Sequence, residues 1–525
     1  MSQPANLSPS AYLKDHASAG RGVFASTLIP PGTEILNVTD PLICIPDDAH
    51  LDTCCHYCMA EATDEASSVN QAYRPPVKLS YCLGCRVVKY CSKACQTTDW
   101  KQKSHKYECV IYKAQYPRVL PVTARAILRM AKQFLSETPG SNIVGGIGAL
   151  KAHAEGFVKV GGDRWEMANL TAKGAAEFSK VSKQVSFEPE FLRDMYCKLL
   201  INSATVVTQT FDPIGLCLAY QGAMFNHSCD PNAIMMFDGR QLSIRSLKEI
   251  PKDAEITISY IDNLSTRKER KEDLKSRYFF DCACSLCSSD VQPLESSRCP
   301  KCKGSIPSNT TTCPNCNQIT PDDELSAAIA LAASTTTQRT KRNADKSPTT
   351  TLKSLQSLYS ANLPPTFPPI PQLHQDLATS YIDEANWKTA FLHLLTLYVK
   401  VYPAVYATPY HPVRVVRTFT LAMVLIQIAV DAPEGLGENI DFTKVLYGLL
   451  TEVCGNVEKS HGGQSTFAEV VRRKMEEVKV DIGIDSNWEA DKWMGKGLRA
   501  IPDLEGEVAK IIKIVDEFLE TLKSN

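Results

Sequence analysis

The spacing of the cysteines constrains the fold of this chain more than any other feature. Twenty cysteines occur among 525 residues, and most stand in close pairs or triplets. Between residues 55 and 109, short motifs supply eight metal-ligating side chains: Cys55 and Cys58, Cys82 and Cys85, Cys91 and Cys95, His105 and Cys109. Eight such donors suffice for two tetrahedral zinc ions. Cys54 and His56 flank Cys55 and either could take its place, but a two-residue gap to Cys58 is the commoner geometry and favours Cys55.

A second set of cysteines lies further along the chain. Cys282, Cys284 and Cys287 supply three ligands without a fourth nearby, and Cys229 is the candidate for the missing one. The next four cysteines form two pairs with ten residues between them: Cys299 and Cys302, Cys313 and Cys316. This pattern is typical of a zinc ribbon that needs no outside ligand.

Length and charge narrow the class of protein. The length predicts three or four domains of ordinary size. A net charge of −1 gives no overall attraction to nucleic acid or to an anionic membrane. Residues 74–106 are locally basic, which leaves DNA contact open but favours a docking face for proteins. The N-terminus lacks the pattern of a secretory signal, and the apolar stretch Leu421–Val430 is too short to span a bilayer. We expect a soluble monomer without membrane contact, in the cytoplasm and the nucleus.

A polar loop stands between short segments of strand character. Strands are expected at Ala233–Phe237, Gln241–Ser246 and Glu255–Tyr260, with a hairpin turn at Asp238-Gly239 between the first two. The loop before them, Asn226–Asn232 (NHSCDPN), has no structural need for so many polar groups. A binding role is therefore favoured over a plain turn.

Several motifs together resemble known domains. Residues 89–96 (KYCSKACQ) and 105–109 (HKYEC) resemble a MYND zinc finger. Gly20-Arg21-Gly22, the NHSC sequence and residues 256–260 (ITISY) occur in the order expected of a SET domain, which the finger interrupts. The whole chain resembles the SMYD family of SET and MYND domain lysine methyltransferases.

The resemblance implies an α+β multidomain fold, with a split SET β-fold, a post-SET zinc site, a four-cysteine ribbon and a helical TPR-like C-terminal domain. The expected segments are a disordered N-terminus (1–10), the N-terminal part of SET (11–50), the MYND finger (51–110), an insertion (111–200), the C-terminal part of SET (201–265), the post-SET region with its zinc site and ribbon (266–320), a helix and linker (321–370) and the TPR-like domain (371–525).

The resemblance also implies roles for particular residues. S-adenosylmethionine (SAM) would be bound by Ala19, Gly20, Arg21, Asn202, Asn226, His227, Tyr260 and Phe280. Tyr260 and Tyr278 would be the catalytic residues that line the lysine channel. One zinc would take Cys55, Cys58, Cys91 and Cys95, the second Cys82, Cys85, His105 and Cys109, the third Cys229, Cys282, Cys284 and Cys287, and a fourth Cys299, Cys302, Cys313 and Cys316.

The implied function is methylation of lysine in a histone or non-histone protein, with proline-rich or regulatory proteins docking on the MYND finger. Ala204 departs from the family, which usually places an aromatic residue there. It could widen the lysine channel, or mark a site that has lost activity. Ala204 therefore favours one alternative, a catalytically silent adaptor built on the MYND and helical domains. A second alternative, a DNA-binding zinc protein, rests only on the basic residues between 74 and 106.

Other segments carry simpler expectations. Helices are expected at Val119–Ser136 and Thr266–Arg277, and throughout the region from residue 371. A glycine-rich loop is expected at 140–149, and a flexible connector at Thr335–Thr351.

Overall fold

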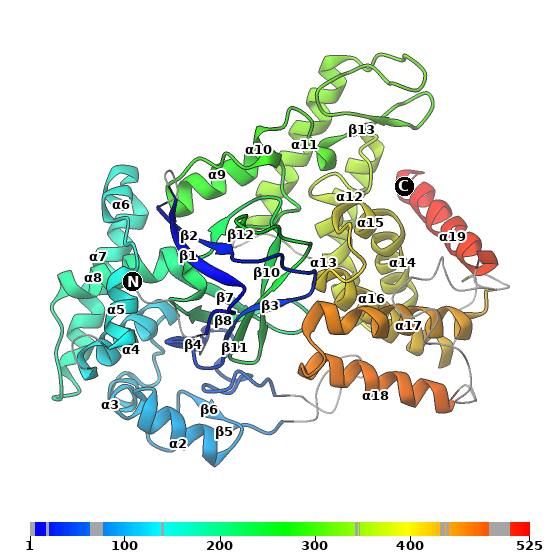
Figure 1. The fold of residues 1–525 in the computed structure, drawn as a ribbon. Coiled ribbons are helices and arrows are strands. Elements are labelled where there is room, and N and C mark those ends of the chain that lie inside the picture. The colour runs from blue at the N-terminus through cyan, green and yellow to red at the C-terminus, as the bar shows by residue number, and fades with distance from the viewer. Residues whose placement is uncertain are drawn as a thin grey trace. The chain divides into compact units, whose positions relative to one another are not determined.

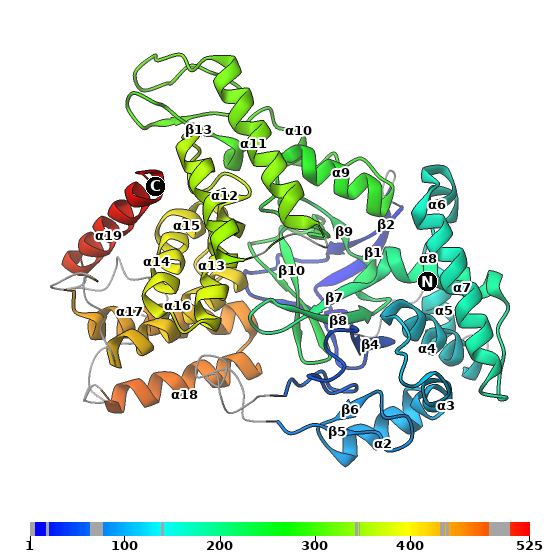
Figure 2. The same ribbon diagram turned by 180° about the vertical axis from the view of Figure 1, so that it is seen from behind.

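The computed structural model describes residues 6–16, 20–62, 77–137, 141–341, 345, 347–430, 436, 440–481 and 505–524. The chain forms two compact units (Figures 1 and 2). The first comprises Met1–Ile258 and Asp273–Asp281, and the second comprises Ser259–Glu272 and Cys282–Asn525.

Short strands in three small sheets build the centre of the first unit. In chain order the strands of this unit are β1 (Ala11–His16), β2 (Gly20–Ala25), β3 (Glu34–Val38), β4 (Ile43–Pro46), β5 (Ser80–Tyr81), β6 (Lys89–Tyr90), β7 (Ala204–Val207), β8 (Pro213–Leu218), β9 (Asn226–His227), β10 (Ala233–Asp238), β11 (Gln241–Ser246) and β12 (Glu255–Ile258). The sheet orders are β1-β2-β12-β9, β10-β11-β3 and β4-β8-β7, and β5 pairs with β6 in the finger (Figure 1). Strands encoded before residue 50 thus pair with strands encoded after residue 200, which closes the β-fold around the inserted segment.

The hairpin predicted at Asp238-Gly239 is present. Asp238 pairs with Gln241 at the end of β10 and β11, and Gly239 takes a positive φ of 60° that the tight turn requires. Along β11 the side chains of Leu242 and Ile244 are buried while their neighbours are half-exposed. This period of two fixes which face of the sheet packs on the core.

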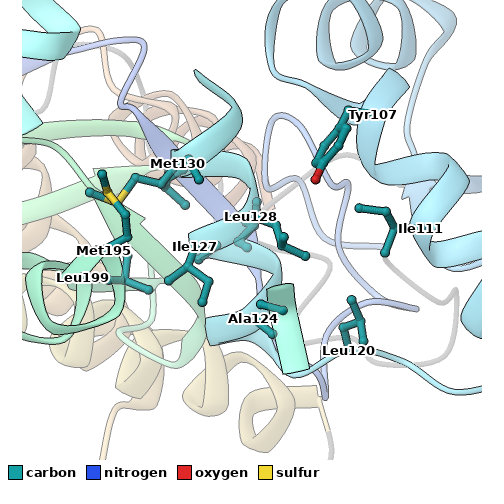
Figure 3. Packing of buried hydrophobic residues seen from close by; sticks show 14 of the residues in the cluster. Tyr107, Ile111, Leu120, Ala124, Ile127, Leu128, Met130, Met195 and Leu199 are labelled. Atoms are coloured by element: carbon teal, nitrogen blue, oxygen red, sulfur yellow. The ribbon is translucent and has the colours of Figure 1, made fainter. Parts of the chain in front are cut away.

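Helices cover the sheets of the first unit and connect the finger to them. They are α2 (Lys93–Gln102), α3 (His105–Gln115), α4 (Val122–Ser136), α5 (Asn142–Ala149), α6 (Ala154–Val160), α7 (Asp163–Lys180), α8 (Pro189–Asn202) and the 3-10 turn η1 (Gly222–Met224). Figure 3 shows buried side chains of α4, such as Ile127 and Leu128, between Tyr107 of α3 and Met195 of α8. Each fully buried side chain of this size contributes about 1.5–3 kcal/mol, so α4 joins the finger firmly to the rest of the unit.

Three expectations are wrong in detail. Residues 142–149 form the helix α5 instead of a loop, because Ser141 caps its N-terminus and Gly146 packs flat against the ring of Tyr220. The expected disorder does not extend over residues 6–10, because Leu7 bridges to Leu36 and the Ser8 N–H donates to the Ile35 carbonyl. The expected connector Thr335–Thr351 is largely helical, since α11 and α12 cover most of it.

The second unit begins with small zinc-type elements and continues as helices. Its elements are α9 (Arg267–Tyr278, which crosses the division between the units), α10 (Ser285–Ser288), η2 (Pro293–Glu295), β13 (Ser297–Arg298), β14 (Ser305–Ile306), α11 (Asp322–Thr340), α12 (Pro348–Ser360), α13 (Ile370–Asp383), α14 (Trp387–Thr396), a π-helical turn (Leu397–Val401), α15 (Tyr402–Val405), α16 (Pro412–Val430), α17 (Phe442–His461), α18 (Thr466–Asp481) and α19 (Glu505–Ser524). Helices adjacent in sequence pack together, notably α13 with α14, α16 with α17 and α17 with α18 (Figure 2).

Helix α16 is the most apolar helix of this unit. Its residues Pro412–Ala429 are long and apolar enough to cross a membrane by length and composition alone, yet 67% of this window is buried inside the protein. It packs on α14 and α17, and side chains such as Phe419 and Val424 are fully buried. These contacts are those of the central helix of a helical domain.

Candidate functional site

The first group of zinc-type ligands joins the loop after β4 to the start of α2. Cys58 and Cys91 sulfur atoms lie 3.5 Å apart, as do those of Cys91 and Cys95, and Cys55 completes the group. Zinc–sulfur bonds of about 2.3 Å in a tetrahedron place sulfur atoms about 3.8 Å apart, so the spacing fits zinc. Cys55 takes the position that the sequence left open between Cys54, Cys55 and His56.

The second group is fully buried and comes from the β5–β6 hairpin and from α3. The sulfur atoms of Cys82 and Cys109 lie 3.8 Å apart, and His105 Nε2 lies 3.4 Å from Cys82 Sγ and 3.9 Å from Cys85 Sγ. Its ligand pairs alternate along the chain with those of the first group. The structure therefore brings the ligands together in the interleaved arrangement that the MYND resemblance implies.

A buried ionic network lies behind the second group. His105 Nδ1 lies 3.6 Å from Glu108 Oε2. Arg129 of α4 donates two hydrogen bonds of 2.6 Å to the Glu108 carboxylate. Arg129 also lies 3.1 Å from Asp99 of α2. A carboxylate behind a metal-binding histidine fixes its ring orientation and increases its basicity as a ligand. Arg129 thus ties α2, α3 and α4 to one zinc-type site.

Charge balance in this network explains the shifted pKa values. Burial alone would raise the pKa of Glu108, but Arg129 outweighs it and lowers that pKa. Burial raises the pKa of Asp99 despite the same arginine. His56, His105 and Glu108 also lie close enough to hold a metal. Since Arg129 is 3.3 Å from His56 Nε2, its positive charge opposes a separate cation there.

Two further cysteine groups belong to the second unit. In the ribbon, the sulfur atoms of Cys299 and Cys316 lie 3.6 Å apart and those of Cys302 and Cys313 lie 3.5 Å apart. The backbone N–H of Cys302 contributes most to lowering the pKa of Cys299 to about 6, which favours the thiolate that zinc requires. The sulfur atoms of Cys282, Cys284 and Cys287 lie within 4.8 Å of one another. Cys229 lies in the first unit, and its role as the fourth ligand stays a prediction.

A candidate site for a small ligand, called the cradle below, begins at the Gly20-Arg21-Gly22 motif of β2. Gly20 has a φ of +81°, and a Cβ atom added there would lie 2.7 Å from Lys151 Nζ. A Cβ atom added at Gly22 would lie 2.5 Å from Glu255 Oε1. Only glycine fits at either position without displacing its neighbours. The two glycines of the Gly20-Arg21-Gly22 motif therefore allow the side chains of Lys151 and Glu255 to lie close to the backbone.

The other predicted ligand-binding residues lie around this cradle. Strand β9 runs parallel to β12 and presents Asn226, whose Nδ2 donates to the Arg21 carbonyl at 3.0 Å and to Glu255 Oε1 at 2.7 Å. The next residue, His227, has its ring centroid 6.1 Å from that of Phe280. These contacts form a continuous set from β2 to the aromatic face of Phe280.

The end of α8 and the segment after α5 complete the cradle. Asn202 Nδ2 donates to the Lys151 carbonyl at 3.0 Å, and the Arg21 guanidinium donates to the Ala149 carbonyl at 3.2 Å. Sequence reasoning missed residues 149–151, because no motif marks them. A lysine directly after a glycine-rich stretch was the one signal available.

Three predicted residues stand apart from this set. Ala19 lies outside the described residues. Tyr278 is half-buried in the first unit, and burial raises its pKa. Tyr260 is half-buried and belongs to the second unit, two residues after β12 ends. That the two tyrosines line one channel stays a prediction.

Comparison with known proteins agrees with this architecture. The family model described as "SET domain" matches residues 20–261. SET domain and MYND-type zinc finger protein 6 of Schizosaccharomyces pombe is 31% identical over 272 residues, which are 52% of this chain and 50% of that protein. Histone-lysine N-methyltransferase SMYD3 of Mus musculus is 29% identical over 274 residues, 52% of this chain and 60% of that protein. Histone-lysine N-methyltransferase ASHR1 of Arabidopsis thaliana is 24% identical over 465 residues, 82% of this chain and 90% of that protein. The matches to the first two span only about half to three fifths of those relatives.

The protein is thus an α+β protein with a β-rich SET domain, cysteine clusters suited to zinc and a helical C-terminal region. Its homologues are SMYD-family proteins, which combine SET and MYND domains, so the resemblance read from the sequence is confirmed. SET methyltransferases use SAM. The cradle fits such a cofactor, because it offers amide groups, close backbone approach at glycine and an aromatic face.

Proposed function

We propose that this chain is a protein-lysine N-methyltransferase that transfers the methyl group of SAM to the ε-amine of a lysine in a histone or non-histone protein. The main support is the continuous set of contacts that links Arg21, Asn226 and His227 to Phe280. Relatives named as histone-lysine N-methyltransferases and N-lysine methyltransferases add to it.

In this proposal the cradle holds and orients the cofactor. Backbone groups from Ala19 to Arg21 wrap it, and the amides of Asn202 and Asn226 hydrogen-bond its polar parts together with His227. Phe280 stacks on the adenine, since an aromatic face suits a flat base. SAM, when bound, supplies an electrophilic methyl group attached to a positively charged sulfur atom.

The lysine channel has to deliver a neutral amine. A free lysine side chain has a pKa of about 10.4 and is ~99.9% protonated at pH 7. A narrow apolar channel disfavours the ammonium form, and a water path can remove the proton. Tyr260 and Tyr278 position the amine for in-line displacement. Because burial raises the pKa of Tyr278, its phenol stays neutral at pH 7 and acts through hydrogen bonds.

Four zinc ions stabilise this arrangement in our proposal. Two occupy the MYND finger and one the four-cysteine ribbon. Cys282, Cys284 and Cys287 take Cys229 as their fourth ligand, because they offer three thiols and Cys229 is a buried thiol at the end of the NHSC motif. All four are structural sites whose ligand sets leave no position open for chemistry.

The same proposal covers partners and location. The MYND finger docks proline-rich or regulatory proteins, and the enzyme acts as a monomer in the cytoplasm and the nucleus. None of the twenty cysteines is in a disulfide bond, and clusters of metal thiolates suit the reducing conditions of those compartments.

Equilibrium binding of SAM to the zinc-replete full chain tests the proposal without knowledge of the substrate. Phe280→Ala should weaken binding about tenfold or more through loss of stacking, and Asn226→Ala should also weaken it. Asn37→Ala is the matched control, because this amide hydrogen-bonds Glu34 and Gln241 in a different sheet. Binding unaffected by both cradle variants, or no binding by folded wild type, would refute the enzyme and favour the adaptor.

A further inference from the structure

A small pocket opens beside Tyr278 in the first unit. It has a volume of about 210 Å³ and lies between α7, the end of α8, β7, β8 and α9. Among its lining residues are Ser203, Ala204 and Leu216 together with two arginines, Arg164 and Arg277. Ala204 leaves room at this point because its side chain ends at Cβ.

The two arginines give the pocket a positive charge. Within the described part of the chain, no carboxylate lies within 4.0 Å of either guanidinium. Arg164 is half-buried, and both its burial and the charge of Arg277 lower its pKa. The two cations therefore repel each other, and a bound anion would relieve that repulsion.

The position of Arg164 is fixed by its neighbours. It donates a hydrogen bond to the Ser276 carbonyl, and its guanidinium carbon lies 4.8 Å from the ring centroid of Phe157 and 5.3 Å from that of Phe279. Arg277 is exposed and lies 5.5 Å from the ring centroid of Tyr278. An anion in the pocket would thus contact the guanidinium of Arg164, which its neighbours hold in place, and the exposed guanidinium of Arg277 beside a predicted catalytic tyrosine.

We propose that this pocket binds the carboxylate of an aspartate or glutamate that neighbours the target lysine in the protein substrate. The inference rests on the proposed function. Ala204 and Tyr278 belong to the predicted lysine channel, so an anion bound beside them would lie next to the target lysine. Arginine pairs with a carboxylate through parallel hydrogen bonds, so the pocket selects for acidic sequence around the lysine.

Three fluorescent peptides test the proposal on the zinc-replete full chain. Each carries one central lysine, and the two residues on either side are all glutamate, all glutamine or all lysine. Charge-assisted hydrogen bonds predict that the glutamate peptide binds roughly tenfold more tightly than the glutamine peptide at low salt, with a smaller advantage at high salt. The lysine peptide should bind most weakly.

Two variants and a control test whether the pocket causes the preference for the glutamate peptide. Arg277→Ala removes an exposed charge and should reduce the glutamate preference to about threefold or less. Ala204→Phe fills the pocket and should abolish the preference without changing the charge. Lys268→Ala removes a charge from the same helix at a side chain that is 83% exposed, and the preference should remain.

Equal binding of the glutamate and glutamine peptides, or a preference that survives in both Arg277→Ala and Ala204→Phe, would overturn the proposal. Methyl transfer to the same peptides separates this outcome from failure of the proposed function. Methyl transfer without a glutamate preference would support the proposed methyltransferase and refute the proposed role of the pocket. Glutamate preference in binding without transfer to any peptide would support an anion-binding pocket and count against the methyltransferase.

Discussion

The MYND finger and the helical part of the second unit bury histidine in opposite surroundings. In the finger, His105 lies among thiols and carboxylates, with Arg129 close behind them. In the helices, His374 and His393 lie at 0% and 1% exposure, joined by a 2.8 Å contact between their Nδ1 atoms. Tyr359 reaches His374 Nε2 at 2.7 Å, while Tyr381 stacks on His393 and Phe518 packs edge-on against it.

The difference shows two ways to bury a polar ring. Burial alone would lower the pKa of His105, but Cys82, Cys85 and Glu108 raise it well above its usual value. These surroundings favour a positive charge at the ring, the kind of charge that a bound metal ion supplies. Burial among neutral groups lowers the pKa of His393 to about 3 and that of His374 well below its usual value. We therefore expect the finger to depend on metal and ion pairs, and the helical region to depend on its histidines staying neutral.

The largest expected effect comes from removing a buried metal ligand. Cys82→Ser should release about two zinc ions, because interleaved ligands make the finger fold and unfold as one unit. Cys302→Ser in the ribbon is the matched control, since Cys302 is exposed and its group is separate; it should release about one. The zinc that each purified variant still binds is counted with a metallochromic indicator, after gentle protease treatment has freed it from the protein. Equal zinc loss from both variants would contradict the interleaved finger.

Breaking the ion network should have the next largest effect. Arg129→Met leaves Glu108 and Asp99 buried without their cation, which should lower the stability of the first unit by about 3–5 kcal/mol. Zinc release to a chelator should also become faster, because His105 loses its support. Urea unfolding and chelator kinetics measure both effects. Arg118→Met is the control, since Arg118 is exposed. A similar loss of stability in Arg118→Met would contradict the importance of the Arg129 ion network.

Acidification from pH 7 to about pH 6 should have the smallest effect and should act on the helices. The pKa of His393 is lower in the folded state than the usual value near 6.5, so the unfolded state binds the additional proton between these values. Stability is therefore complete above about pH 6.5 and falls by up to about 1.4 kcal/mol per pH unit and per histidine as the pH decreases towards 3. His374 and the half-buried His411 add in the same direction.

Hydrogen exchange of peptides from α13 and α14 in urea, corrected for intrinsic rates, follows this loss between pH 7 and pH 4.5. His393→Gln should reduce the slope, whereas His461→Gln, outside the histidine pair, should leave the contribution of His393 in place. An unchanged slope in His393→Gln would show that the pair does not govern the acid response.

Local signals in the sequence predicted much of this architecture. The Asp238-Gly239 turn and its two strands followed from short-range rules, and the cysteine groups followed from their spacing. The helix at 142–149 was missed because three glycines lower its intrinsic propensity. Packing of Gly146 against Tyr220 outweighs that propensity, and no local sequence pattern predicts such a contact.

By itself the sequence determined the metal-ligating motifs, the SET motifs and the helical C-terminal region, because spacing along the chain encodes each of them. Only the tertiary structure decided that β2 pairs with β12 around the inserted finger. It also brought Arg129 behind His105 and placed Arg164 beside Arg277 in one pocket. These residues are far apart in the sequence, and the packing of helices and sheets, not their spacing, brings their charges together.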